Sequence, residues 1–134
     1  MQTVILCGGK GTRLREYTEN IPKPLVEIGG KPIIWHLMKI YANYGFKDFI
    51  LCLGYKGEII KEYFKDSKDW NITFVDTGIE TNTGGRIKKI EKFIKGDIFF
   101  ANYADGLASI NLKELLEHHK SGKKIVTLTT VNPL

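Results

Sequence analysis

The chain has 134 residues, of which 43% are hydrophobic and 26% are charged, a composition typical of one globular domain and not of a disordered or fibrous protein. The formal net charge of +5 suits an anionic partner, but the lysines alternate with acidic residues, as in Lys61-Glu62 and Lys65-Asp66, and form no basic arm for nucleic acid. We therefore expect a phosphorylated small molecule, which needs only a few of these cations, and no nucleic acid.

The first half of the chain alternates short apolar runs with amphipathic ones. Residues 3–7 (TVILC) and 48–53 (DFILCL) are typical of buried strands. Residues 31–45 predict a helix, with a proline in its first turn and a glycine at its end. A short helix is predicted over residues 58–65, directly after the second strand.

The second half repeats this pattern. It predicts strands over residues 72–75 (ITFV), 97–102 (DIFFAN) and 124–131 (KIVTLTTV). It predicts helices over residues 85–94 and 111–120, and the latter opens on an asparagine N-cap with a glutamate three residues on.

Strand and helix thus alternate four times before the last strand. This order indicates an α/β fold with a mostly parallel sheet and helices on both of its faces. Ligands of such sheets bind beyond the carboxyl ends of the strands. The loops that follow Cys7, Leu53, Val75 and Asn102 are therefore the candidate site.

The two cysteines and the N-terminus give information about the cellular compartment of the protein. Cys7 and Cys52 each close an apolar run, and their spacing fits neither C-x-x-C nor a zinc site. We expect buried, reduced thiols in a cytoplasmic protein. Residues 1–3 carry no basic n-region, the apolar run behind them is too short for a signal peptide, and no stretch approaches the ~20 apolar residues of a span. We expect no membrane partner.

A glycine-rich loop, residues 8–13 (GGKGTR), directly follows the first strand. Glycines let backbone N–H groups approach an anion without a Cβ in the way. Arg13 adds a planar guanidinium that suits phosphate oxygens. Lys23 stands between Pro22 and Pro24, which hold it on a stiffened segment. The loop therefore indicates an anion site, and the alternative is a plain glycine-rich turn with basic residues at the surface.

Two familiar phosphate loops do not fit these residues. A Walker A loop needs lysine after its last glycine, whereas here Lys10 precedes Gly11. The dinucleotide fingerprint needs a third glycine where Leu14 stands, and an acid near the end of the second strand, where Leu53 is followed by Gly54. A dehydrogenase is therefore not expected.

The stretch from residue 8 to residue 25 resembles the signature of the sugar-1-phosphate nucleotidyltransferases, G-G-x-G-T-R-L followed by P-K-P. The matching residues are Gly8, Gly9, Gly11, Thr12, Arg13, Leu14, Thr18, Pro22, Lys23, Pro24 and Leu25. Within that family the chain is most similar to the glucose-1-phosphate cytidylyltransferases. That similarity lies at Glu16 and in residues 27–32 (EIGGKP), 54–57 (GYKG), 60–64 (IKEYF), 75–78 (VDTG) and 83–86 (TGGR), and it covers essentially the whole chain.

The resemblance implies a Rossmann-like nucleotidyltransferase core, similar to the GT-A fold. It also implies transfer of a cytidylyl group from CTP to a sugar 1-phosphate, such as glucose 1-phosphate, giving a CDP-sugar and pyrophosphate. The sugar phosphate attacks the α-phosphorus in line, so the protein positions two polyanions and neutralises their charge with cations and Mg²⁺. Transfer from dTTP or UTP, another phosphorylated acceptor, and a catalytically silent nucleotide-binding module remain alternatives.

The resemblance also assigns roles to residues. Arg13 and Lys23 would be the catalytic cations, and Asp105 would hold Mg²⁺. The nucleotide would contact Leu6, Cys7, Gly8, Gly9, Lys10, Gly11, Thr12, Arg13, Thr81, Arg86 and Ala104. Two of these assignments have simpler alternatives. Residues 83–85 (TGG) also form a good turn into a helix, and Asp105 before Gly106 is also a common turn residue.

Three departures from the family limit the comparison. Residues 66–71 fill a space that holds a longer insert in the cytidylyltransferases, and Ala104 replaces a glycine of the family's Y-G-D-G. Family members are also longer, and their second half supplies most sugar contacts and a second metal-binding aspartate. We expect residues 1–134 to be the nucleotide-binding part of the domain, without its C-terminal half. A fragment is the first explanation, beside a truncated gene or a half that relies on another chain. The resemblance further implies a homo-oligomer.

Overall fold

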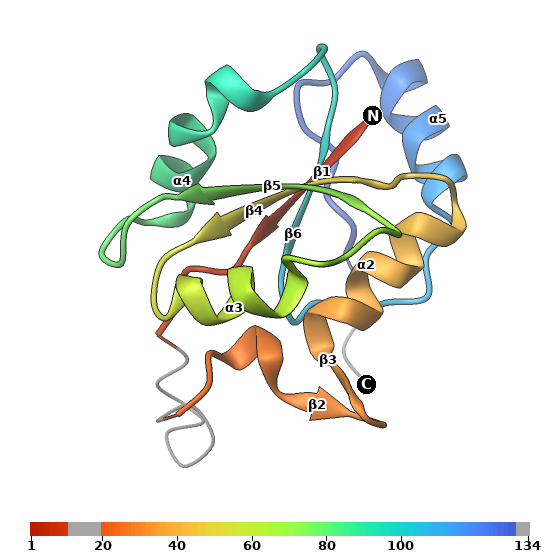
Figure 1. Cartoon of the computed structure of the whole chain (residues 1–134). Coiled ribbons are helices and arrows are strands. Elements are labelled where there is room, and N and C mark those ends of the chain that lie inside the picture. The colour runs from red at the N-terminus through yellow and green to blue at the C-terminus, as the bar shows by residue number, and fades with distance from the viewer. Residues whose placement is uncertain (11–19, 131–134) are drawn as a thin grey trace.

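Four of the predicted strands form one sheet in the order β5-β4-β1-β6 (Figure 1). The computed structural model describes residues 1–10 and 20–130. The strands are β1 (Gln2–Leu6), β4 (Asp48–Leu53), β5 (Asn71–Asp76) and β6 (Phe100–Tyr103). Every neighbouring pair in this sheet is parallel, which confirms the predicted α/β class.

The register of β1 brings three strand ends level with one another. Leu6 stands opposite Cys52 of β4 and opposite Tyr103 of β6. Cys52 in turn stands opposite Val75 of β5. Residues that follow these positions therefore leave the sheet along a common edge, as parallel strands require.

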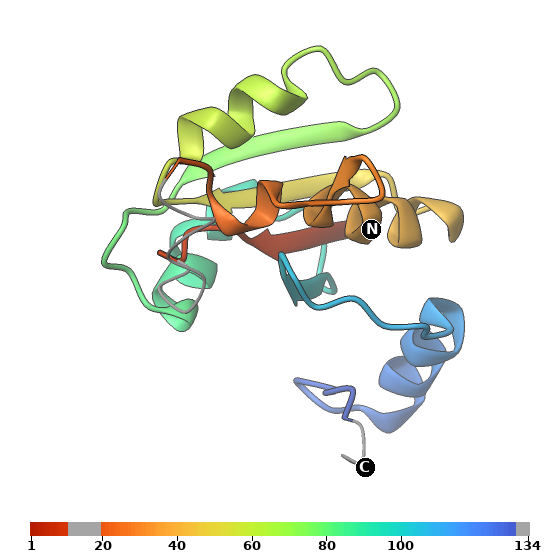
Figure 2. The ribbon, with the colours of Figure 1, turned by 90° about the horizontal axis from the view of Figure 1, so that it is seen from below.

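Helices cover both faces of the sheet, as predicted (Figures 1 and 2). Successive side chains of a strand point to opposite faces. Ile5 of β1 thus packs with α2 (Ile33–Asn43) and α3 (Gly57–Phe64), whereas Val4 packs with Ile90 at the end of α4 (Thr83–Lys89) on the opposite face.

The remaining elements are short or lie at the margin. The 3₁₀ helix η2 (Lys23–Leu25) precedes a small antiparallel pair, β2 (Glu27–Ile28) and β3 (Lys31–Pro32). The 3₁₀ helix η3 (Glu91–Phe93) follows α4. Helix α5 (Leu112–Gly122) lies beyond the β6 side of the sheet (Figure 2), and Leu112 is its buried residue.

Several predicted boundaries shift, each for a local reason. The helix predicted over residues 31–45 begins at Ile33, because residues 31 and 32 pair with β2. The helix predicted over residues 85–94 begins at Thr83, because the Asn82 side chain caps it by accepting from the amide of Gly85 at 2.8 Å. That helix ends at Lys89 and continues as η3.

The strand predicted over residues 124–131 is wrong in the part that the structure describes. Residues 124–130 have no strand structure, and Ile125 and Leu128 are 97% and 79% exposed. A run of β-formers becomes a strand only where a neighbouring strand supplies hydrogen bonds and packing. In the described sheet β6 is paired only with β1.

The helices were also compared with the requirements of a membrane span. No helix among the described residues is both long enough and apolar enough to cross a bilayer.

Candidate active site

A cleft of about 480 Å³ opens where the strand order reverses. From β1 the chain proceeds to β4 on one side, and it later returns to place β6 on the other side. The crevice beyond the carboxyl ends of two such strands is the usual ligand position in open α/β sheets. The cleft is lined by residues 6–10 after β1, residues 79–83 and Arg86 after β5, residues 103–105 after β6, and Lys23 with Pro24.

The described part of the glycine loop is anchored to the sheet. Cys7 donates its amide to the carbonyl of Cys52 at 3.0 Å, and Gly8 accepts from the amide of Tyr55 at 3.3 Å. A Cβ on Gly8 would overlap the guanidinium of Arg86, whereas a Cβ on Gly9 would meet no atom within 4 Å. Glycine at position 8 is thus set by packing, and Gly9 is open to the cleft. The predicted contacts Gly11, Thr12 and Arg13 lie outside the described residues.

Lys23 is held at the mouth of the cleft by its neighbours. The amide of Leu25 donates to the carbonyl of Pro22 at 2.8 Å, which closes the turn of η2. Pro24 and Leu25 are buried and fix the segment to the core. Lys23 lines the cleft, and its ammonium forms an ion pair with Asp105; the two side chains are 32% and 38% exposed. The predicted catalytic lysine and the predicted metal ligand are therefore brought together.

Asp105 stands on a turn that β6 places beside the glycine loop. Asn102 donates its side-chain amide to the carbonyl of Gly106 at 3.2 Å, and Gly106 donates to the carbonyl of Tyr103 at 3.2 Å. Ala104 is buried and donates its amide to Leu6 at 3.3 Å. Ala104 also lines the cleft, at a position where the family pattern has glycine.

The donor set around Asp105 suits a cation that brings its own ligands. In the part of the chain that the structure describes, no group of three or more His, Cys, Asp or Glu side chains could enclose a metal. Mg²⁺ is commonly held by one or two carboxylates, and substrate phosphates and water complete its octahedron. The ammonium of Lys23 shows that a cation at this carboxylate is compatible with the surroundings.

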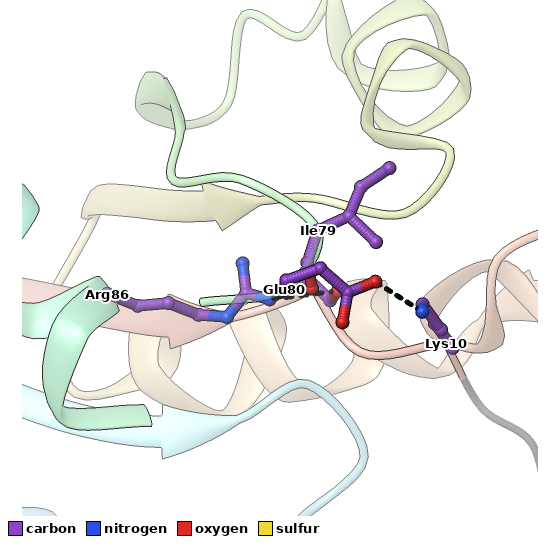
Figure 3. A network of polar contacts seen from close by, with 5 residues as sticks. Lys10, Ile79, Glu80 and Arg86 are labelled. Atoms are coloured by element: carbon purple, nitrogen blue, oxygen red, sulfur yellow. Dashed lines mark hydrogen bonds and ion pairs between the residues drawn. The ribbon is translucent and has the colours of Figure 1, made fainter. Parts of the chain in front are cut away.

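Residues 79–83 line the cleft after β5, and Figure 3 shows Ile79 and Glu80 of this segment near Arg86 and Lys10. Thr81 accepts from the ammonium of Lys89 at 3.0 Å, and Thr83 shares a hydrogen bond of 3.2 Å with the hydroxyl of Tyr103. Glu80 forms an ion pair with Lys10 of the glycine loop across the mouth. Arg86 reaches the cleft, but its guanidinium is buried and faces protein oxygens.

Sequence analysis missed Glu80, Thr77 and Tyr103. Thr77 and Tyr103 lie inside motifs that the sequence shares with the family, yet nothing in the pattern assigned them a role. Glu80 is an exposed acid, and its partner is separated from it by 70 positions, so no local signal identifies the pair.

Cys7 lines the cleft but is unsuited to covalent catalysis. Burial raises the pKa of the Cys7 thiol well above its usual value, with a further increase from Cys52 and an opposing effect of Arg86. Burial likewise raises the pKa of Cys52 to about 11. The thiolate is the nucleophilic form of cysteine, so both thiols stay protonated and unreactive near neutral pH.

The chain belongs to the nucleotidyl transferase family, which matches residues 2–133. It is 47% identical, over 98% of its length, to the probable glucose-1-phosphate cytidylyltransferase of Bacillus subtilis. It is 45% identical, over 99% of its length, to the glucose-1-phosphate cytidylyltransferase of Salmonella typhimurium. The chain spans 61% of the length of each of these relatives.

A solved structure has the same arrangement of helices and strands. HddC from Yersinia pseudotuberculosis, complexed with GMP-PN, matches with a TM-score of 0.77 and 32% identity over 88% of this chain and 53% of that chain. The predicted family and its Rossmann-like nucleotidyltransferase fold are therefore confirmed.

Proposed function

We propose that this chain is the nucleotide-binding part of an enzyme that joins CTP and glucose 1-phosphate to give CDP-glucose and pyrophosphate. The observation that carries the proposal is the meeting of Lys23 and Asp105 at the mouth of the glycine loop. A cation, a carboxylate and the main-chain amides of a glycine loop at the end of the first strand suit a metal-bound triphosphate. The identity of 45% to 47% to cytidylyltransferases supports the choice of CTP and glucose 1-phosphate.

The chemistry asks the protein to bring two polyanions together. A phosphate oxygen of the sugar attacks the α-phosphorus of CTP as the bond to pyrophosphate breaks, so a P–O bond forms and another breaks without a covalent enzyme intermediate. Lys23 lies where its ammonium can neutralise both phosphates once it leaves Asp105. When bound by Asp105, Mg²⁺ supplies additional positive charge against the phosphates. The catalytic role of Arg13 stays a prediction.

The wall formed by residues 79–83 is the surface that would meet the base. Its exposed side chains do not by themselves select cytosine, so transfer from dTTP or UTP, or to another phosphorylated acceptor, is the alternative within the class. A silent binding module is disfavoured, because Lys23 and Asp105 are both retained and adjacent. We place the protein in the cytoplasm, where free cysteines such as Cys7 and Cys52 stay reduced, and assembly into a homo-oligomer stays a prediction.

Calorimetric titration of the chain with CTP, UTP and dTTP in the presence of Mg²⁺ tests the proposal. CTP should bind most tightly. Lys23→Ala should weaken CTP binding by about 10- to 100-fold, the usual scale of a hydrogen bond to a charged group. Lys61→Ala is the matched control, because Lys61 forms an ion pair with Glu58 on an exposed helix turn. Absence of binding by all three nucleotides would refute the proposal, and equal binding would refute the choice of CTP.

A further inference from the structure

Arg86 joins three strand ends that the sequence places far apart. Its Nη1 donates to the carbonyl of Leu53 at 3.1 Å and to Oγ1 of Thr77 at 2.7 Å. Its Nη2 donates to the carbonyls of Gly8 and Ile79, each at 3.1 Å. The side chain thus ties β1, β4 and the loop after β5 together, and Figure 3 shows it reaching from α4 to this loop.

The surroundings of Arg86 are built to hold a guanidinium. The residue is 6% exposed, and among the described residues its contacts are neutral oxygens and no carboxylate. A Cβ on Gly54 would lie 2.9 Å from Nη1 and 2.8 Å from the Cα of Gly8. Glycine at positions 8 and 54 therefore leaves the space that the guanidinium fills.

The bond to Gly8 fixes the direction of the next amide. The peptide unit is planar and trans, so the Gly8 carbonyl and the Gly9 N–H point in opposite directions. Because that carbonyl faces Arg86 at 3.1 Å, the Gly9 N–H points away from the guanidinium. The carbonyl of Ile79 also faces Arg86, at 3.1 Å. For the same reason, the N–H of Glu80 points away from Arg86.

We propose that Arg86 is a positioning residue, which orients the main-chain amides of the glycine loop and of the loop after β5 toward a bound nucleotide. This role rests on the proposed function and differs from the direct nucleotide contact that family resemblance implies. The four protein oxygens already occupy both terminal nitrogens of the guanidinium. Arg86 therefore acts on the ligand through Gly8 and Ile79.

The test compares Arg86→Ala with Arg86→Lys, and Lys88→Ala serves as control because Lys88 lies on the same helix with a side chain that is 77% exposed. CTP affinity should fall at least tenfold in both Arg86 variants, the scale of lost charge-assisted bonds. Lysine cannot reproduce the planar fork. Low-millimolar guanidinium chloride should restore part of the affinity of Arg86→Ala, because the ion can fill the vacated space, and should leave Lys88→Ala unchanged.

Amide hydrogen exchange separates positioning from direct contact. The amides of Tyr55 and Thr77, which donate to Gly8 and Leu53 at 3.3 and 3.0 Å, should exchange at least about tenfold faster in both Arg86 variants without nucleotide. Lost CTP affinity with unchanged exchange and no rescue would assign Arg86 to direct contact and overturn the proposal, as would unchanged affinity. If the wild-type chain binds no nucleotide, the proposed function fails, and the exchange rates still judge whether Arg86 orders the two loops.

Discussion

The cleft contains two kinds of positive charge, and they differ in burial. Arg86 is 6% exposed and is held by four neutral oxygens. Lys10 and Lys23 have side chains that are 49% and 32% exposed, and each is held by one carboxylate. A buried donor left unpaired costs its full desolvation energy, whereas an exposed ion pair contributes about 0–1 kcal/mol. The buried cation is therefore part of the scaffold, and the exposed cations can exchange their partners for a ligand.

The largest effect should come from filling the space of the guanidinium. Gly8→Ala should lower the free energy of unfolding by about 3 kcal/mol, because the new Cβ overlaps Arg86 and forces it out of a packed site. Gly9→Ala is the matched control, since a Cβ there meets nothing within 4 Å. Urea denaturation measures both variants. Equal stability of the two would show that the Arg86 site is loose.

A smaller effect should follow from removing one oxygen of the same site. Thr77 is fully buried, and its hydroxyl donates to Leu53 at 2.7 Å while it accepts from Arg86 at 2.7 Å. Thr77→Val keeps the shape but leaves one N–H of the buried Arg86 guanidinium without its acceptor, while the Leu53 carbonyl keeps the Arg86 and Thr77 main-chain donors. We therefore expect a loss of about 1–3 kcal/mol in urea denaturation. Thr83→Val, at an exposed position, should change stability by less than half as much. A larger loss of stability in Thr83→Val than in Thr77→Val would contradict the difference between the buried Arg86 site and the exposed surface of the cleft.

The smallest effect is expected at the exposed pair across the mouth. Glu80→Gln removes the partner of Lys10, and both side chains are largely exposed, so stability should change by less than about 1 kcal/mol. CTP affinity should rise slightly at low salt, because Lys10 is free to meet the triphosphate, and this gain should vanish at high salt. Glu91→Gln removes a comparable surface pair with Lys88 and should leave binding unchanged. A large loss of stability in Glu80→Gln would show that the Lys10–Glu80 pair stabilises the fold as the buried Arg86 site does.

The buried strands and the order of the elements are the features that the sequence could predict. The strand over residues 48–53 was predicted with its observed bounds, because burial on both faces leaves an uninterrupted apolar run. The order of strands and helices fixes which loops meet at one edge of the sheet, and the structure brings the described residues 8–10, Lys23 and Asp105 together there. Their roles in binding stay predictions.

The remaining features depend on contacts that no local pattern contains. The partners of Arg86 come from three parts of the chain and are mostly main-chain carbonyls, which carry no residue signature. The strand predicted over residues 124–131 is wrong at residues 124–130 for a related reason: these residues have strand-forming side chains, but no strand of the described sheet is paired with them. A residue pattern predicts where a strand can form, and pairing with a neighbouring strand decides whether it forms.

Backbone chemical-shift mapping with a non-hydrolysable CTP analogue and Mg²⁺ tests most directly whether the strand-end cleft is the nucleotide site. We expect the amides of residues 6–10, 79–83, 86 and 103–105 to shift together as the analogue saturates the chain, while those of α2 and α5 stay in place. Shifts confined to α2 or α5, or a saturating analogue that leaves Gly8, Gly9 and Asp105 unmoved, would contradict the proposed site.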